Sequence, residues 1–413
     1  MKKIQQLTQS KQVNQVVILY ASTLIGVAIG VLNSVINTRA LSPELYGDYR
    51  YVQNIIAFVS SLLVLGYFTS GSRLLAISKD EGHSRKIRGV MCVILCVTIA
   101  ILMLVMTVMY LTNNKEAMNQ LYLYSIPLCG SNLMLNYINT TAQGDNHIVR
   151  IAIARVIPSL LYCVIAYIIY KTFSATPGLM LLLYNGIAIL VLLFVILSTH
   201  PSFVNLRDSF HELREENKTY GFNVYLGALM GVSTSYIAGI TLGKFCDTNA
   251  NVGFYTLALT IATPLSTLPA IIGTTQFKKF AVQNNISKNV FFGSFVLTFL
   301  SAIIFIALIK YIVSFLYDDS YAIVSIYASF LAISMCFHGL GDMINRFLGA
   351  HGQGRQIRNS AFICGFIKLI GSVVLVYYWH IWGAIVTALL GAISYFMALF
   401  IYYRLFINKK DYE

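Results

Sequence analysis

Long apolar runs, each followed by a short polar segment, recur along the whole chain. A helical run of about 20 residues is long enough to cross ~30 Å of hydrocarbon, since an α-helix rises ~1.5 Å per residue. The pattern predicts twelve membrane-spanning helices, and short loops between them make neighbours antiparallel. The predicted spans are 15–38, 43–70, 88–110, 117–141, 149–171, 177–198, 221–242, 251–275, 289–314, 321–345, 359–379 and 381–404.

One polar segment is longer and more charged than the others. It covers residues 199–220 and has six predicted spans on either side. We interpret it as a loop that links two halves on the cytoplasmic side. The predicted domains are therefore an N-terminal six-helix bundle at 1–198, the linker at 199–220, and a C-terminal six-helix bundle at 221–413.

The joint between the first two spans has the features of a helix start. In the stretch RALSPELYGDYRY, residues 39–51, Ser42 suits a helix N-cap and Pro43 suits the first helical position. Arg50 then lies seven residues inside the helix, roughly 10 Å along its axis. A charged residue that deep in an apolar helix indicates a function.

A second joint resembles the first and indicates an internal repeat. In KFCDTNANVGFY, residues 244–255, Gly253 and Tyr255 stand 206 positions after Gly47 and Tyr49. Each half contains an even number of spans, so the two copies point the same way through the membrane and a pseudo-twofold axis along the membrane normal relates them. The predicted fold class is an all-α polytopic membrane protein with two six-helix bundles.

Composition and charge agree with a membrane protein. The 413 residues are 57% hydrophobic and 11% charged, with mean hydropathy +0.71, whereas soluble domains are about 25% charged. The net charge is +13, and 20 of the 29 Lys and Arg fall in the termini and even-numbered loops, against five in odd-numbered loops. The positive-inside rule then places both termini in the cytoplasm. The positive charge is therefore explained by topology, and no nucleic-acid partner is predicted.

Several polar residues inside the spans are candidate ligand-binding residues. Arg50, Arg155 and Lys368 lie within predicted helices, and a charge at the bilayer centre costs ~2.5–3.5 kcal/mol on insertion scales. An internal aqueous cavity removes most of that cost, and a cationic lining suits an anionic ligand. The substrate-binding candidates are Arg50, Arg155, Lys368, Arg39, Asn132 and Asn136. The alternatives are snorkelling for the basic residues and helix-to-helix hydrogen bonding for the asparagines.

Three further residues are candidates for coupling to an ion gradient. Asp48 lies within the first joint, and His338 and Asp342 stand one helical turn apart in the tenth predicted span. Arg346 stands one turn beyond Asp342, so the alternative for Asp342 is an ion pair with Arg346. The pairs Gly26/Gly30 and Gly227/Gly231 have small-xxx-small spacing, which predicts close helix packing.

The chain lacks the motifs of several enzyme classes. It contains no G-x-x-x-x-G-K-[ST], H-E-x-x-H or G-x-S-x-G sequence, and its predicted extracytoplasmic loops are too short for a catalytic domain. Six of the seven cysteines lie in apolar spans and none forms a C-x-x-C pair, which favours buried small hydrophobes. We therefore expect no catalytic residue, no metal and no cofactor.

Two motifs resemble a known family. The stretch R-x-L-S-P-E-x-Y-G at Arg39 to Gly47, and LGYFTSGSRLLA at Leu65 to Ala76, are similar to bacterial polysaccharide or O-antigen flippases of the Wzx-like group. That group belongs to the multidrug/oligosaccharidyl-lipid/polysaccharide exporter superfamily. The resemblance extends over the whole chain in length, span count and six-plus-six arrangement.

The resemblance implies a secondary transporter and not an enzyme. Its substrate would be an undecaprenyl-pyrophosphate-linked oligosaccharide, such as an O-antigen repeat unit, moved by alternating access from the cytoplasmic to the periplasmic leaflet of the bacterial inner membrane. The implied partners are this substrate, membrane lipids, a polysaccharide polymerase and a chain-length regulator. The alternatives are a cation-coupled multidrug exporter of the same superfamily, a membrane glycan polymerase and a scaffold for glycan assembly.

Overall fold

The computed structural model describes residues 2–78, 80–232 and 234–411, and its regular secondary structure is helical throughout these residues. The chain forms two compact units. The N-terminal unit consists of residues 1–40 and 55–226, and the C-terminal unit of residues 41–54 and 227–413. The first part of α2 (Pro43–Leu63) therefore belongs to the C-terminal unit, although it comes from the N-terminal half of the sequence.

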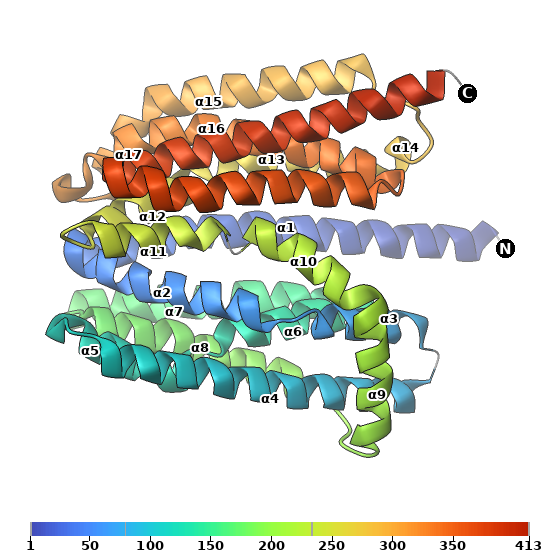
Figure 1. Ribbon diagram of the computed structural model, residues 1–413, viewed down its shortest axis with the longest axis horizontal. Coiled ribbons are helices and arrows are strands. Elements are labelled where there is room, and N and C mark those ends of the chain that lie inside the picture. The colour runs from blue at the N-terminus through green and yellow to red at the C-terminus, as the bar shows by residue number, and fades with distance from the viewer. Residues whose placement is uncertain (1, 79, 233, 412–413) are drawn as a thin grey trace. The chain divides into compact units, whose positions relative to one another are not determined.

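The N-terminal unit is a bundle of long apolar helices (Figure 1). α1 packs along α7, α7 along α8, and α3 along α6, while α4 contacts α5 and α6. Besides the end of α2, its helices are α1 (Lys2–Ala40), α3 (Tyr67–Ile77), α4 (Glu81–Thr112), α5 (Glu116–Ser125), η1 (Ile126–Leu128), α6 (Ser131–Gly144), α7 (Ile148–Thr172), α8 (Pro177–Leu197), α9 (Leu206–Glu216), η2 (Asn217–Gly221) and the start of α10 (Phe222–Val232).

The C-terminal unit is built around α16, which packs against α12, α13, α15 and α17. Met343 and Phe347 on α16 and Leu399 on α17 are fully buried in its core. Its helices are α11 (Thr234–Phe245), α12 (Ala250–Ala262), α13 (Pro264–Thr275), α14 (Phe277–Phe280), α15 (Lys288–Leu316), η3 (Asp319–Tyr321), α16 (Val324–Ala350) and α17 (Gly354–Asp411).

The predicted fold class, an all-α polytopic membrane protein, is confirmed. Among the described residues, eight helices are long and apolar enough to cross a membrane, or up to ten if two bent pairs each count as one span. α17 contains two of the predicted spans, because His380 has non-helical φ/ψ angles that divide it. The predicted span at 117–141 is divided into α5, η1 and α6, so it contains no single long helix.

The bend between α2 and α3 has a local cause. The two helices meet at 57°, and both Leu65 and Gly66 between them have positive φ, which ends the helix. Asn217 supports the bend, since its Nδ2 donates to the Leu65 carbonyl and its Oδ1 accepts from Ser70 Oγ at 3.0 Å. A residue from the polar segment therefore satisfies backbone that the bend leaves without a helical partner.

The polar segment is not the loop that its composition suggested. Residues 206–216 form α9, in which Ser209 and Leu213 are buried and the remaining side chains are mostly exposed. The prediction of a loop was wrong because tertiary contacts hold these three turns of helix: Ser209 and Leu213 are buried, the Phe210 ring stacks on Tyr67, and Glu216 pairs with Arg73 at 2.7 Å. This short amphipathic pattern is easily hidden among charged residues.

The glycine pairs chosen from the sequence are not the close-packed ones. A Cβ built on Gly26, Gly30 or Gly231 meets no atom of the described residues within 4 Å. A Cβ on Gly239 would instead clash with the Asn54 side chain, and one on Gly243 with the Tyr51 ring. Gly239 and Gly243, one turn apart on α11, thus leave room for two side chains of α2.

Candidate functional site

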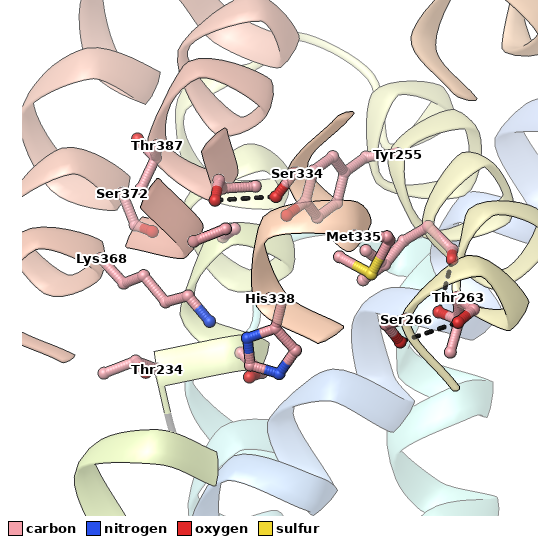
Figure 2. Close-up of a pocket in the computed structure, with 15 residues that line it drawn as sticks. Thr234, Tyr255, Thr263, Ser266, Ser334, Met335, His338, Lys368, Ser372 and Thr387 are labelled. Carbon is pink, nitrogen blue, oxygen red and sulfur yellow. Dashed lines mark hydrogen bonds between the residues drawn. The ribbon is translucent and has the colours of Figure 1, made fainter. Parts of the chain in front are cut away.

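A polar cavity lies inside the C-terminal unit (Figure 2). It has a volume of about 230 Å³ and is formed by α11, α12, α13, α16 and α17. Its lining combines one lysine and one histidine with many hydroxyl groups: Thr234, Ser235, Tyr255, Thr263, Ser266, Ser334, His338, Lys368, Ser372 and Thr387. Such a lining offers hydrogen-bond donors and one full positive charge.

Lys368 projects into this cavity because of a glycine opposite it. A Cβ on Gly391 would lie 2.7 Å from Lys368 Cγ, so the lysine stem packs directly on the backbone of the neighbouring part of α17. Figure 2 shows the side chain extending towards the His338 ring. Within the described part of the chain, the ammonium group of Lys368 has no hydrogen bond and no ion pair. It therefore keeps its three N–H donors for a ligand or water.

One turn further along α17, Ser372 offers a second donor. The residue is 1% exposed, and its Oγ has no hydrogen-bond partner among the described residues. The other buried hydroxyls here are satisfied by backbone, since Ser334 Oγ donates to the Ala388 carbonyl at 2.9 Å and Thr387 Oγ1 to the Gly383 carbonyl. A buried hydroxyl left without any partner costs about 1–3 kcal/mol, so the Ser372 Oγ is available to a water or to a ligand in the cavity.

His338 lines the cavity, whereas Asp342 lies beside it in a hydrogen-bonded chain. Tyr395 OH donates to Asp342 Oδ1 at 3.0 Å and accepts from Asn345 Nδ2 at 2.8 Å. The His338 and Tyr395 rings lie 5.2 Å apart between centroids. The alternative of an Asp342–Arg346 ion pair is not seen among the residues that the structure describes, and Arg346 is exposed. Tyr395 links the two coupling candidates, and no sequence motif marked it.

Arg50 and Asp48 lie elsewhere in the same unit, at the start of α2. Arg50 Nη1 donates to Gln53 Oε1 at 2.9 Å, and Gln53 Nε2 donates to Tyr49 OH at 2.8 Å. Asp48 Oδ1 accepts a hydrogen bond from Asn249 Nδ2 at 2.6 Å. Neither residue lines the cavity of Lys368.

The two joints of the internal repeat contact each other reciprocally. A Cβ on Gly47 would clash with the carbonyl oxygen of Asn249, and a Cβ on Gly253 would lie 3.1 Å from the carbonyl oxygen of Pro43. Gly253 stands 206 positions after Gly47, and Asn249 stands 206 positions after Pro43. Equivalent residues that exchange equivalent contacts are the mark of a local twofold relation. The contact therefore supports the repeat that the sequence indicated.

In the N-terminal unit, Arg155 and Asn132 line a separate cavity of about 130 Å³. Arg155 is exposed, and its Nε donates to Asn139 Oδ1 at 3.3 Å. Asn136 does not line this cavity, but its Oδ1 is buried without a hydrogen-bond partner in the described part of the chain. Pro158 within α7 also lines the cavity, next to Ser159, whose carbonyl accepts from Asn33 Nδ2.

Arg39 lines a third site, a groove of about 490 Å³ between α1 and α7. The structure thus brings together Lys368 and His338 in one cavity and Arg155 and Asn132 in another, and Arg50 lines neither. Their roles as ligand-binding or coupling residues remain predictions. No cluster of three or more His, Cys, Asp or Glu suited to a metal occurs in the described residues.

Comparisons with known proteins agree with this architecture. The family model for "Polysaccharide biosynthesis protein" matches residues 13–277. No curated protein matches the sequence.

Solved structures match over nearly the whole chain. The structure of the lipid II flippase MurJ in an inward closed conformation has a TM-score of 0.74 at 13% identity, over 93% of this chain and 87% of that one. An inward-facing multidrug resistance MATE family transporter of the MOP superfamily has a TM-score of 0.66 at 14% identity, over 95% and 98% of the two chains. The Vibrio cholerae MATE transporter VcmN in the bent form has a TM-score of 0.53 at 13% identity, over 97% and 99%.

At these identities the structural matches establish the fold, and the family model, which covers more than half of the residues, establishes the relationship. The chain is a multi-pass membrane protein of the polysaccharide biosynthesis protein family.

Proposed function

We propose that this protein is a flippase for an undecaprenyl-pyrophosphate-linked oligosaccharide, such as an O-antigen or other surface-polysaccharide repeat unit. It moves this substrate by alternating access from the cytoplasmic to the periplasmic leaflet of the bacterial inner membrane, with both termini in the cytoplasm. The family relationship supports a role in polysaccharide assembly, and one of the structural neighbours is by name a lipid II flippase. A polymerase and a chain-length regulator are the proposed partners.

The observation that carries the proposal is the cavity of Lys368. An ammonium group without an anionic partner among the described residues lies in a cavity lined by hydroxyls and an imidazole. Phosphate oxygens and sugar hydroxyls are matched by such donors. A cationic drug would be repelled by the same lysine, so the cavity favours the anionic substrate over that of a drug exporter.

The membrane potential favours export of such a substrate. A pyrophosphate diester carries about two negative charges, and moving one charge outwards across an inside-negative membrane gains ~2.3 kcal/mol per 100 mV. The resulting gain of roughly 4–5 kcal/mol per 100 mV helps to drive the headgroup outwards. Arg50 and Arg155 are the further proposed headgroup contacts, and Asp48, Asp342 and His338 are the proposed coupling residues.

Lys368→Ala tests the proposal. Lipid-linked glycan is measured in each leaflet of cells that carry the variant, with protein levels compared by immunoblot. We expect the outer-leaflet pool to fall about tenfold or more, since a charge-assisted hydrogen bond is worth ~1.5–3 kcal/mol. Lys310→Ala is the matched control, because Lys310 is an exposed lysine on α15 that does not line the cavity.

Two outcomes contradict the proposal in different ways. Unchanged flipping in Lys368→Ala removes Lys368 from the mechanism. Normal flipping in a strain that lacks the protein altogether, with loss of polymerised glycan, would favour a polymerase instead.

A further inference from the structure

Two basic residues lie at the mouth of an apolar groove on the N-terminal unit. The groove, formed by α1 and α7, has a volume of about 490 Å³, and Arg39 and Lys171 both line it. Its remaining lining is mostly aliphatic, and includes Leu32, Ile36, Val164 and Ile168. From Leu32 to Arg39 the α1 side of the groove extends roughly 10 Å along the helix, at ~1.5 Å per residue.

Two tyrosines locate the mouth relative to the membrane. Tyr167 and Tyr170 line the groove within the last two turns of α7, and Lys171 Nζ lies 5.5 Å from the centroid of the Tyr170 ring. Tyrosine is enriched at the level of lipid headgroups, and Lys and Arg near helix ends place their charges there. The mouth of the groove therefore lies at headgroup level, and the aliphatic part extends into the acyl region.

The positive-inside rule does not account for Arg39 and Lys171. On the predicted topology only five Lys or Arg lie on the extracytoplasmic side, and two of the five line this one groove. Each residue is in the last turn of its helix, where a cation stabilises the helix dipole. The dipole accounts for either residue alone, but not for both at the end of one shared apolar groove.

We propose that the α1–α7 groove is an outer-leaflet binding site for a polyprenyl diphosphate lipid. The isoprenoid chain lies along the aliphatic lining, and Arg39 and Lys171 contact the diphosphate. Two cations match the two or more negative charges of a diphosphate better than the single charge of a phospholipid diester. The choice of this lipid rests on the proposed function, and it makes the groove the place where the substrate lipid is held after translocation.

The native Cys163 provides a probe, because it lines the groove and is a free thiol. The other six cysteines are replaced by serine or alanine, Cys163 is labelled with bimane, and the protein is placed in nanodiscs of phosphatidylcholine with brominated acyl chains. Bromine quenches the label when a brominated chain lies in the groove. Undecaprenyl diphosphate, undecaprenol and unbrominated phosphatidylglycerol are then titrated separately.

We expect undecaprenyl diphosphate to relieve quenching at a roughly 30-fold lower mole fraction than undecaprenol, since two basic residues near the surface together add ~2 kcal/mol of attraction. In the double variant Arg39→Gln, Lys171→Gln this difference disappears, whereas Lys310→Gln keeps it. Arg39→Lys with Lys171→Arg restores it, which separates loss of charge from loss of folding. Native mass spectrometry of the unlabelled protein with the same lipids checks that bimane does not block the groove.

The proposal is overturned if undecaprenyl diphosphate and undecaprenol relieve quenching at the same mole fraction in the unsubstituted protein. Phosphatidylglycerol as effective as the diphosphate overturns the choice of lipid. Flipping is measured on the same preparations, so the two ideas fail separately. Lipid discrimination without flipping by the wild-type protein contradicts the proposed function alone, and flipping without lipid discrimination contradicts the groove alone.

Discussion

Lys368 and Ser372 stand one turn apart on α17, yet they differ in how their polar atoms are satisfied. The lysine can reach ligand or water in the cavity, whereas the serine hydroxyl is buried and has no partner among the described residues. Ser334 in the same cavity has its hydrogen bond to the Ala388 carbonyl. Single substitutions of these three side chains can therefore test separately what each contributes to stability and to transport.

Ser372→Ala should separate stability from transport. Removing a buried hydroxyl that has no partner in the described part of the chain relieves its desolvation cost, so the melting temperature should stay the same or rise, with a gain of up to ~1 kcal/mol. On the proposed function transport should fall, because the residue can no longer donate a hydrogen bond to a substrate in the cavity. Both are measured on purified protein, by thermal unfolding and by flipping in vesicles.

Ser334→Ala is the comparison for this prediction. It loses a formed hydrogen bond and should cost about 1 kcal/mol of stability. A loss of stability in Ser372→Ala as large as that in Ser334→Ala would show that the Ser372 hydroxyl already has a partner in the apoprotein.

At the scale of elements, the ends of three helices are joined by one buried arginine. The Arg88 side chain on α4 is 5% exposed and pairs with Asp145 at 3.1 Å, where Asp145 follows α6 and is itself 6% exposed. Arg88 Nη1 also contacts Glu81 Oε1 at 2.9 Å and donates to the carbonyl of Thr199, which follows α8. Asp145 follows Gln143-Gly144, and the similar Gln353-Gly354 in the second half is followed by the exposed Arg355, so this ion pair belongs to one copy only.

Arg88→Ala should destabilise the N-terminal unit by about 3–5 kcal/mol, because it leaves the buried carboxylate of Asp145 without its bidentate partner. The measurement is thermal or denaturant unfolding in detergent. Arg85→Ala is the control, since the Arg85 pair with Glu81 spans 3.5 Å at the surface and should contribute less than ~1 kcal/mol. If both substitutions lowered the free energy of unfolding equally, the buried ion pair of Arg88 would be no more stabilising than the surface pair of Arg85.

The packing of α2 in the C-terminal unit depends on Gly47. A methyl group there meets the backbone carbonyl of Asn249, which cannot move as the end of a flexible side chain can. Gly47→Ala should therefore cost about 1–3 kcal/mol through overpacking. Gly30→Ala should be neutral or stabilising by up to ~1 kcal/mol, because no described atom lies within 4 Å of its Cβ and alanine favours a helix. The stability of both variants is measured by unfolding in detergent. A Gly47→Ala variant as stable as the wild type would contradict the close approach of Gly47 to Asn249.

At the scale of the whole molecule, the basic residues predict the topology. We expect a green fluorescent protein fused after residue 408 to fluoresce, since it stays in the cytoplasm. Alkaline phosphatase fused after Tyr317, between α15 and α16, should be active because that loop is extracytoplasmic on the predicted topology. The opposite pattern of reporter activities would show that the predicted orientation in the membrane is inverted. The α1–α7 groove would then open on the cytoplasmic side.

The sequence by itself determined the fold class and most of the spans. Apolar runs near 20 residues can satisfy their backbone in lipid only as helices, so their positions follow from hydropathy alone. Ser42 was predicted as an N-cap, and the Leu45 amide does donate to its Oγ at 3.4 Å. Local chemistry of this kind needs no knowledge of distant neighbours.

The tertiary structure decided which side chains meet. Lys368 and His338 stand 30 positions apart and share a cavity, while Arg50, deep in its own helix, contacts Gln53 and lines neither cavity. Gly239 and Gly243 are among the close-packed glycines, whereas Gly26 and Gly30 of the predicted pairs are not, because spacing shows which residues share a helix face but not which face meets another helix. Likewise, nothing in the separate sequences of α1 and α7 shows that Arg39 and Lys171 line one groove. Their proximity depends on the packing of two helices that are far apart in the chain.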